Sequence, residues 1–220
     1  MRKIDIEVYD DFVSPTYLSE IQKATDPEGT PWFFQGSQSL SRYDDSKIED
    51  YGFSIGLLPP WKPNEFENTR LADLIRPLIY QVTDVAKSTR ILRCRLDMTI
   101  LHQPPYIHPP HIDIEEPHIA CIIYVNDTDG DTVIYDHKQE WATSYPENLP
   151  IKRTIAPKAG RMVLFDGRYV HTGHSPSEHQ TRILINTVLA LVTSYGSRSI
   201  DPRRLRIVSY PNVSKIHSKK

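Results

Sequence analysis

The chain has 220 residues, of which 39% are hydrophobic and 25% are charged. This length suits one large domain, or one domain with an extension, and the hydrophobic fraction is enough to form a sizeable core. A formal net charge of −2 gives the molecule as a whole no strong attraction to nucleic acid or membranes.

The two cysteines indicate a reducing environment. Cys94 and Cys121 each lie in an apolar run, as buried free thiols usually do. The N-terminal stretch has no apolar segment of signal-peptide length, and the sequence contains no run of about 18 apolar residues. We therefore expect a cytoplasmic protein with no membrane partner.

Two helices are expected in the first part of the chain. Residues 14–24 begin with a serine cap followed by proline, which is a typical helix start. Residues 68–87 carry an apolar stripe at three- and four-residue spacing, which indicates core packing. Asn68 is the expected cap of this second helix, and Pro77 is expected to kink or divide it.

Short strands dominate the rest of the chain, and the alternation of apolar and polar side chains is clearest in residues 92–100. The expected strands cover residues 4–8, 32–35, 53–58, 92–100, 118–126, 132–135, 152–155, 161–165 and 182–192, and another begins at 169–171. Residues 127–131 are expected to form a hairpin turn. This pattern favours a mainly β protein with some α-helix (α+β), a jelly roll packed against N-terminal helices. The pattern alone leaves a sandwich or another barrel equally open.

Two histidines and one aspartate are candidate metal ligands. His111 and Asp113 follow a proline-rich stretch, residues 104–110, and residues two apart on a strand face the same side. His171 comes after a turn–strand–turn sequence and is preferred to His174, which follows a turn-forming Thr-Gly pair. Two imidazoles and one carboxylate can hold one face of Fe(II) and leave three positions open.

His-x-Asp alone is a weak signal, and the other nearby histidines, at positions 102, 108 and 118, are expected to be ordinary cavity or surface residues. A second feature therefore matters. Arg182 leads into an apolar strand, where a charge is expensive to bury unless it is paired. Its planar guanidinium group can meet a carboxylate with two hydrogen bonds. Asn186 lies four residues on, on the same strand face, and could bind the same ligand. The alternative is that Arg182 marks the exposed start of the strand.

Together these residues resemble the Fe(II)/2-oxoglutarate dioxygenase superfamily, and within it the prolyl 4-hydroxylase-like branch. The resemblance covers about residues 91–191, roughly half of the chain. His111, Asp113 and His171 match the iron-binding triad of the family. Arg182 matches the residue that binds the distal carboxylate of 2-oxoglutarate.

Two further positions match the family, and one departs from it. Ile-Ile-Tyr-Val-Asn at 122–126 resembles a strand of prolyl hydroxylases whose tyrosine, here Tyr124, hydrogen-bonds the co-substrate. Asn186 falls where the family often has a small polar residue. Leu101 and His102 stand where the family often has another tyrosine, so the resemblance does not extend to that contact.

The resemblance implies a single catalytic jelly-roll domain over residues 1–197, with a core at about 91–192, followed by a basic tail at 198–220. It implies Fe(II), 2-oxoglutarate and O2 as cofactors and co-substrates, with ascorbate as a candidate accessory reductant. Asp113 favours hydroxylation over halogenation, because the related halogenases lack the metal carboxylate. Val188 stands where the nucleic-acid demethylases have a second arginine.

The main hypothesis is hydroxylation of a peptide or protein, with proline as a candidate target. A free amino acid or other small molecule is the alternative substrate. A jelly-roll module that binds metal without redox chemistry is a further alternative. Nucleic acid stays open as a target because residues 198–220 hold seven of the 26 lysines and arginines and one of the 28 acidic residues. Such a tail is more often simply solvated.

Overall fold

The computed structural model describes residues 4–36, 51–139 and 148–191, so the basic tail and the boundary proposed at residue 197 lie outside the described residues. The helices are α1 (Pro15–Ala24) and α2 (Arg70–Ala86), and the strands are β1 (Ile6–Tyr9), β2 (Phe33–Gln35), β3 (Gly52–Leu58), β4 (Ile91–Ile100), β5 (His118–Tyr124), β6 (Thr132–Lys138), β7 (Ile151–Ile155), β8 (Met162–Asp166), β9 (Tyr169–Gly173) and β10 (Thr181–Ala190). Neither of these helices has the length and apolar character needed to cross a membrane.

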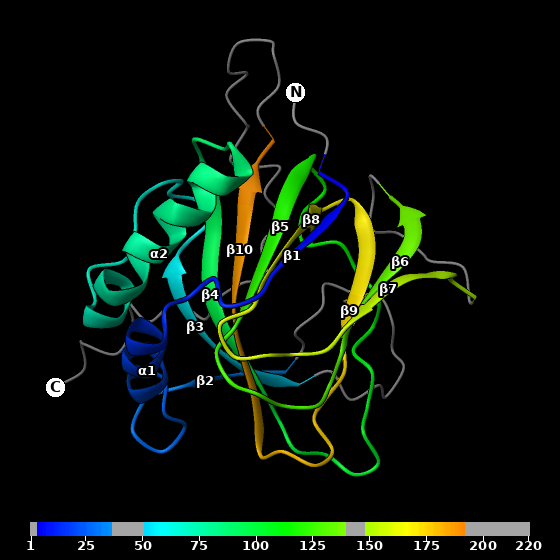
Figure 1. The fold of residues 1–220 in the computed structure, drawn as a ribbon, viewed down its shortest axis with the longest axis horizontal. Coiled ribbons are helices and arrows are strands. Elements are labelled where there is room, and N and C mark those ends of the chain that lie inside the picture. The colour runs from blue at the N-terminus through cyan, green and yellow to red at the C-terminus, as the bar shows by residue number, and fades with distance from the viewer. Residues whose placement is uncertain (1–3, 37–50, 140–147, 192–220) are drawn as a thin grey trace, which may run out of the picture.

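The strands form two antiparallel sheets, and both helices cover the outer face of the larger one (Figure 1). The larger sheet has the strand order β1-β8-β5-β10-β4-β3-β2, and the smaller sheet has the order β7-β6-β9. Most neighbours in these sheets are far apart in sequence, which is the pattern of a double-stranded β-helix. The expected jelly roll with N-terminal helices is therefore confirmed.

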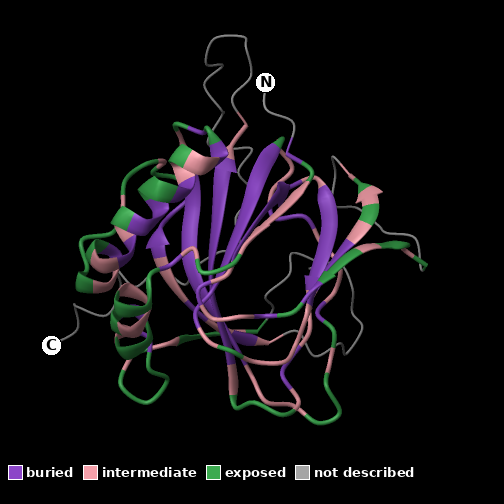
Figure 2. Ribbon diagram, in the orientation of Figure 1, coloured by how far each residue is buried: buried purple, intermediate pink, exposed green. Residues whose placement is uncertain are grey.

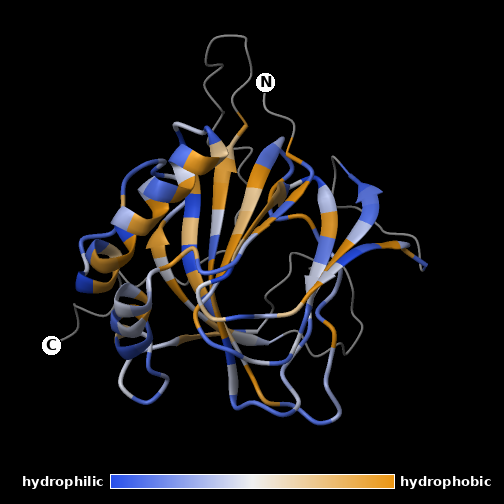
Figure 3. Ribbon diagram, in the orientation of Figure 1, coloured by the Kyte–Doolittle hydropathy of each residue, from blue (hydrophilic) through white to orange (hydrophobic). Residues whose placement is uncertain are grey.

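The two faces of the larger sheet bury different kinds of side chain. Alternate residues of a strand point to opposite faces. One face packs against α1 and α2 in a mainly apolar core that includes Ile79, Leu96 and Ile185. The other face meets the smaller sheet, where Ile122 and Phe165 are part of a second apolar cluster. Figure 2 shows the central strands β4, β5, β8 and β10 of the larger sheet buried, whereas Figure 3 shows hydrophilic positions among the hydrophobic ones along the strands of this sheet. Polar side chains are thus enclosed between the sheets.

Helix α2 differs from the prediction at its start and at its proline. The N-cap is Thr69 and not Asn68, and the Thr69 hydroxyl accepts a hydrogen bond of 3.1 Å from the backbone N–H of Ala72. The helix runs without a break through Pro77, which lies on its exposed side. A proline removes one helical hydrogen bond, and on an exposed face water can satisfy the carbonyl that loses its donor.

The connection at residues 127–131 is not a hairpin. It leads from β5, in the larger sheet, to β6, in the smaller sheet. The Asp129 side chain accepts hydrogen bonds from the backbone N–H groups of Ser177, Glu178 and His179, which fastens the connection to the loop before β10. Alternation in two successive strands does not reveal whether they pair with each other, so the sequence could not show this change of sheet.

A tight turn between β8 and β9 also passes from one sheet to the other and leads to His171. Asp166 fixes this turn, because its carboxylate accepts hydrogen bonds from the backbone and the guanidinium of Arg168 and from Lys138 at 2.7–3.1 Å. Gly167 is required in the turn, because a Cβ there would lie 2.1 Å from the ring of His118. Burial would raise the pKa of Asp166, but the hydrogen bonds lower it from 3.8 to about 2.

We expect Asp166→Asn to lower the free energy of unfolding at pH 7 by about 2 kcal/mol, because the lowered pKa is a stabilisation of the folded state. A group with a depressed folded pKa stabilises the protein above its unfolded pKa, and this contribution is lost as the pH falls through the folded value. The difference between wild type and variant should therefore shrink between pH 5 and about pH 2. Urea unfolding at several pH values measures it. Asp136→Asn, at an exposed position of β6, is the control, and an equal effect of both variants at every pH would contradict the prediction.

Candidate functional site

His111, Asp113 and His171 lie together at the edge of the smaller sheet. His171 is in the middle of β9, and backbone hydrogen bonds of 2.9 Å in both directions join it to His111. The candidate ligand atoms of the three residues all lie within 4.8 Å of one another. One divalent ion can therefore contact all three. His174, the competing candidate, is not in this group.

The backbone fixes the orientation of both imidazoles. Nδ1 of His111 lies 3.0 Å from the carbonyl oxygen of Pro109, and Nδ1 of His171 lies 3.0 Å from that of Tyr169. A carbonyl oxygen can only accept, so Nδ1 carries the proton in each ring and Nε2 keeps its lone pair. Metal-binding histidines are commonly held by such a hydrogen bond from the second ring nitrogen. Both rings are thus prepared to bind a cation through Nε2.

Asp113 supplies the negative charge of the group. The residue is 4% exposed, and its Oδ1 accepts a hydrogen bond from Nη2 of Arg93. Its Oδ2 lies 3.7 Å from Nε2 of His171. Burial would raise the pKa of Asp113, but the charge of Arg93 and the neighbouring imidazoles lower it well below its ordinary value. The carboxylate is therefore ionised at neutral pH, which is the form that binds a metal ion.

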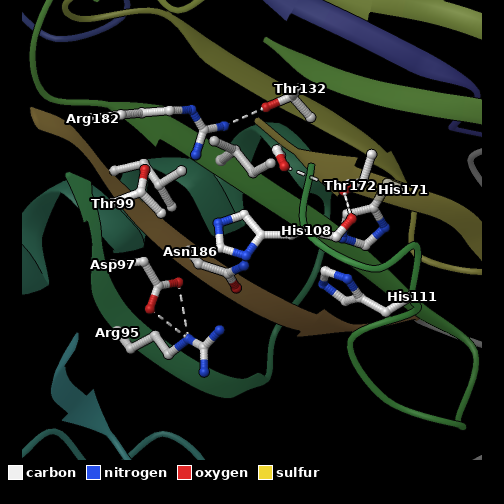
Figure 4. A pocket seen from close by; sticks show the side chains of 13 residues that line it. Arg95, Asp97, Thr99, His108, His111, Thr132, His171, Thr172, Arg182 and Asn186 are labelled. Carbon is white, nitrogen blue, oxygen red and sulfur yellow. Dashed lines mark hydrogen bonds and ion pairs between the residues drawn. The ribbon is translucent and has the colours of Figure 1, made fainter. Parts of the chain in front are cut away.

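The two histidines line a cavity that also contains Arg182 (Figure 4). Arg182 is 5% exposed, and its Nη2 donates a 2.7 Å hydrogen bond to the hydroxyl of Thr132. Its Nε–H group has no hydrogen-bond partner within residues 4–36, 51–139 and 148–191. Burial lowers the pKa of Arg182, which expresses the cost of keeping this charge away from water. A carboxylate bound at this end of the cavity would offset that cost.

Tyr124 lies behind the cavity wall and does not line it. It is fully buried, and its hydroxyl donates a 2.7 Å hydrogen bond to Thr132. Thr132 thus accepts from both Tyr124 and Arg182, so its own O–H can donate into the cavity that it lines. The contact of Tyr124 with a co-substrate stays a prediction, and the structure supplies Thr132 as an intermediate that the sequence did not suggest.

A row of polar residues on β4 also faces the inside of the roll. The row consists of Arg93, Arg95, Asp97 and Thr99, and all four are buried. Arg95, Asp97 and Thr99 line the cavity, and Nε of Arg95 donates to Asp97 at 2.9 Å. Sequence reasoning missed this row, because the same alternation describes a strand with one face in water. The available signal was the density of charge in a single strand, Arg-x-Arg-x-Asp.

The other histidines of this region differ in their surroundings. His108 lines the cavity. His118 is fully buried, and its Nδ1 lies 2.6 Å from the carbonyl oxygen of Glu116. Burial lowers the pKa of His118 to about 4, so the ring is neutral at physiological pH. His102 and His174 are partly buried and do not line the cavity.

The residues fit a divalent metal ion at one end of the cavity and an anion at the other. The metal end offers two Nε2 lone pairs and one ionised carboxylate, on residues whose candidate ligand atoms lie within 4.8 Å of one another. The anion end offers a buried guanidinium whose Nε–H is unsatisfied by any described residue. Asn186 on β10 also lines the cavity, but its Oδ1 already accepts a hydrogen bond of 3.0 Å from Arg93. A small dicarboxylate that reaches from the metal to Arg182 matches this arrangement.

Comparison with known proteins identifies the fold. No family model and no curated protein matches the sequence. Among solved structures, an oxidoreductase of the 2OG-Fe(II) oxygenase family from Burkholderia pseudomallei is 12% identical, with a TM-score of 0.59 over 84% of each chain. A prolyl hydroxylase from Trichoplax adhaerens, solved with a peptide fragment of the hypoxia-inducible factor oxygen degradation domain, is 14% identical. Its TM-score is 0.58 over 84% of this chain and 82% of that one.

SnoN, a non-heme α-ketoglutarate-dependent epimerase from nogalamycin biosynthesis, has a TM-score of 0.56 at 13% identity, over 86% of this chain and 78% of that one. At these identities the similarity shows the fold. The chain has the double-stranded β-helix of the 2OG-Fe(II) oxygenases and carries a candidate His-Asp-His iron site within it. The resemblance to these oxygenases that the sequence indicated is therefore confirmed at the level of the fold.

We expect His171→Ala to weaken the binding of Mn(II), a redox-stable substitute for Fe(II), by at least about 10-fold, since it removes one of three ligands. Isothermal titration calorimetry measures the affinity. His137→Ala is the matched control, because His137 lies on β6 and does not line the cavity. Equal Mn(II) affinity in the His171 variant and wild type would show that these residues do not form the metal site.

Proposed function

We propose that the protein is an Fe(II)- and 2-oxoglutarate-dependent dioxygenase that hydroxylates its substrate. The observation that carries this proposal is that one cavity is lined both by the two histidines of the His-His-Asp ligand group and by a buried arginine that forms no ion pair with the described residues. Neither feature alone is specific, because buried arginines and clusters of histidine also occur for structural reasons. Their presence in one cavity matches a co-substrate that must touch both the metal and a cation.

Each residue has a defined task in this proposal. His111, Asp113 and His171 hold Fe(II) by one face and leave the opposite positions accessible. Arg182 and the Thr132 hydroxyl bind the distal carboxylate of 2-oxoglutarate, and Tyr124 keeps Thr132 in place.

When bound, iron supplies the oxidative chemistry in which O2 and 2-oxoglutarate yield succinate, CO2 and one oxygen atom inserted into a C–H bond. The protein contributes the orientation of these groups and a cavity lined by residues of both sheets. Ascorbate is a candidate reductant for iron that becomes oxidised between turnovers. The cytoplasm is the proposed location.

A peptide or protein is the first substrate that we propose, with a prolyl side chain as a candidate target. The residues 122–126 support this choice through their similarity to a prolyl hydroxylase strand. The Trichoplax adhaerens prolyl hydroxylase, which shares the fold, was solved with a peptide fragment. Two alternatives have less support. One is a nucleic-acid substrate bound through the basic tail, and the other is a metal-binding module without turnover. Arg182 argues against the last, because a simple metal-binding module has no use for a buried anion site.

A small polar molecule, such as a free amino acid, is the second candidate, and the Arg95–Asp97 pair favours it. The two side chains are 8% and 6% exposed and both line the cavity. A buried ion pair seldom adds stability over apolar residues of the same size, so its position at the cavity wall points to a role in recognition. A molecule with one carboxylate and one ammonium group would meet both charges.

We expect the iron-loaded protein to form succinate from 2-oxoglutarate in air, and Arg182→Met to raise the concentration of 2-oxoglutarate required by about 10- to 100-fold. A charge-assisted pair of hydrogen bonds is worth roughly 1.5–3 kcal/mol, which sets that range. Succinate is measured by mass spectrometry, and Arg153→Met, at an exposed position of β7, is the control.

The same assay distinguishes the substrate classes. Proline-containing peptide libraries and pools of free amino acids are offered separately, and the class that raises succinate formation above the uncoupled rate and gains one oxygen atom is the substrate class. Absence of succinate with every pool, together with unchanged 2-oxoglutarate binding in Arg182→Met, would contradict the proposed function.

A further inference from the structure

Arg93 is a buried cation that the proposed reaction does not use directly. Its Nη2 donates to Oδ1 of Asp113 and, at 3.0 Å, to Oδ1 of Asn186. The three residues come from β4, from the segment between β4 and β5, and from β10. They are 9%, 4% and 8% exposed, respectively. Arg93 thus joins the candidate metal carboxylate to the wall of the larger sheet.

The contact with Arg93 gives the two oxygens of the Asp113 carboxylate different surroundings. Oδ1 is held by Arg93, whereas Oδ2 faces Nε2 of His171 at 3.7 Å and has no hydrogen-bond partner among the described residues. A guanidinium can only donate, so an oxygen that accepts from it has less electron density to offer a metal ion. The oxygen on the side of the histidines is the one available as a ligand.

Asn186 keeps Arg93 in this position. Because arginine only donates, the Asn186 side chain must present its oxygen to Arg93, and this fixes which way the amide points. The amide nitrogen is then left for the other side, where Asn186 lines the cavity. The structure thus gives Asn186 a contact with Arg93 that the sequence did not suggest, and its hydrogen bond to the ligand of Arg182 stays a prediction.

We propose that Arg93, anchored by Asn186, is a positioning residue that makes Asp113 a one-oxygen ligand. The number of ligand atoms matters, because an octahedral ion held by two imidazoles and one carboxylate oxygen keeps three positions open, whereas a carboxylate that binds through both oxygens leaves two. A co-substrate that binds through two atoms and an O2 molecule together need three. This inference rests on the metal site of the proposed function.

Metal affinity alone cannot test this role, because removal of Arg93 has two opposite effects on it. Loss of a nearby positive charge strengthens the attraction of Asp113 for a cation. Loss of the hydrogen bond frees the carboxylate and weakens the prepared geometry, which commonly changes metal affinity by about 10- to 100-fold. The number of water molecules on the bound ion is the more direct measurement, and a merely structural role of Arg93 would not change it.

The test is water-proton relaxation of Mn(II) bound to wild type, Arg93→Met, Asn186→Ala and the control Arg76→Met, whose arginine pairs with Asp73 on the exposed side of α2. We expect three coordinated waters in wild type and in the control, two in Arg93→Met, and an intermediate average in Asn186→Ala. Thermal unfolding of the metal-free variants shows that each is folded. Should Arg93→Met fail to fold, Asn186→Ala carries the test, because it removes only one anchor of Arg93.

Two waters in wild type, or three waters in every folded variant, would overturn the inference. Failure of the proposed function would give different results. Wild type would then not bind one Mn(II) per protein, or His171→Ala would bind Mn(II) as tightly as wild type does. The hydration number is interpreted on protein for which metal binding depends on His171.

Discussion

The backbone hydrogen bonds between His111 and His171 are the contact on which the site depends. They join the segment that follows β4 to the middle of β9, two parts of the chain that are distant in sequence. Pairing of the backbones brings the side chains to the same side, and local carbonyl groups then set the orientation of both rings. A metal site made in this way needs little reorganisation on binding, because its geometry is determined by a sheet.

The rest of the fold offsets the free-energy cost of burying charged side chains beside that contact. The helix-facing side of the larger sheet is apolar throughout its core cluster, and it stabilises the strands independently of the cavity. On the inner side, β4 and β10 are antiparallel neighbours, so their polar residues lie in matching rows, with Arg182 opposite Thr99 and Asn186 opposite Arg95. Arg182 and Arg93 then provide positive charge at two separate places, one facing the cavity and one behind Asp113. The first suits an anionic ligand, and the second maintains the carboxylate of the metal site.

Much of the fold and the centre of the site could be predicted from the sequence. The period-two pattern of β4 and the apolar stripe of α2 are local properties, so the chain shows them directly, and the spacing of His111 and Asp113 is local as well. Other features depend on which strands pair. The passage of residues 127–131 between sheets, the position of Tyr124 behind Thr132, and the contact of Arg93 with Asp113 all require that knowledge. The polar row of β4 illustrates the limit, because alternation identifies a polar face without indicating whether that face meets water or a cavity.

An anaerobic titration can show whether one cavity holds both Fe(II) and 2-oxoglutarate, as we propose. Chelation of Fe(II) by a 2-oxo acid gives a visible charge-transfer band, so 2-oxoglutarate is added to the iron-loaded protein without O2 while the absorption spectrum is recorded. We expect a band that saturates at one 2-oxoglutarate per iron and that does not form when succinate, which lacks the 2-oxo group, is added instead. Tight iron binding with no such band at saturating 2-oxoglutarate would contradict the proposal.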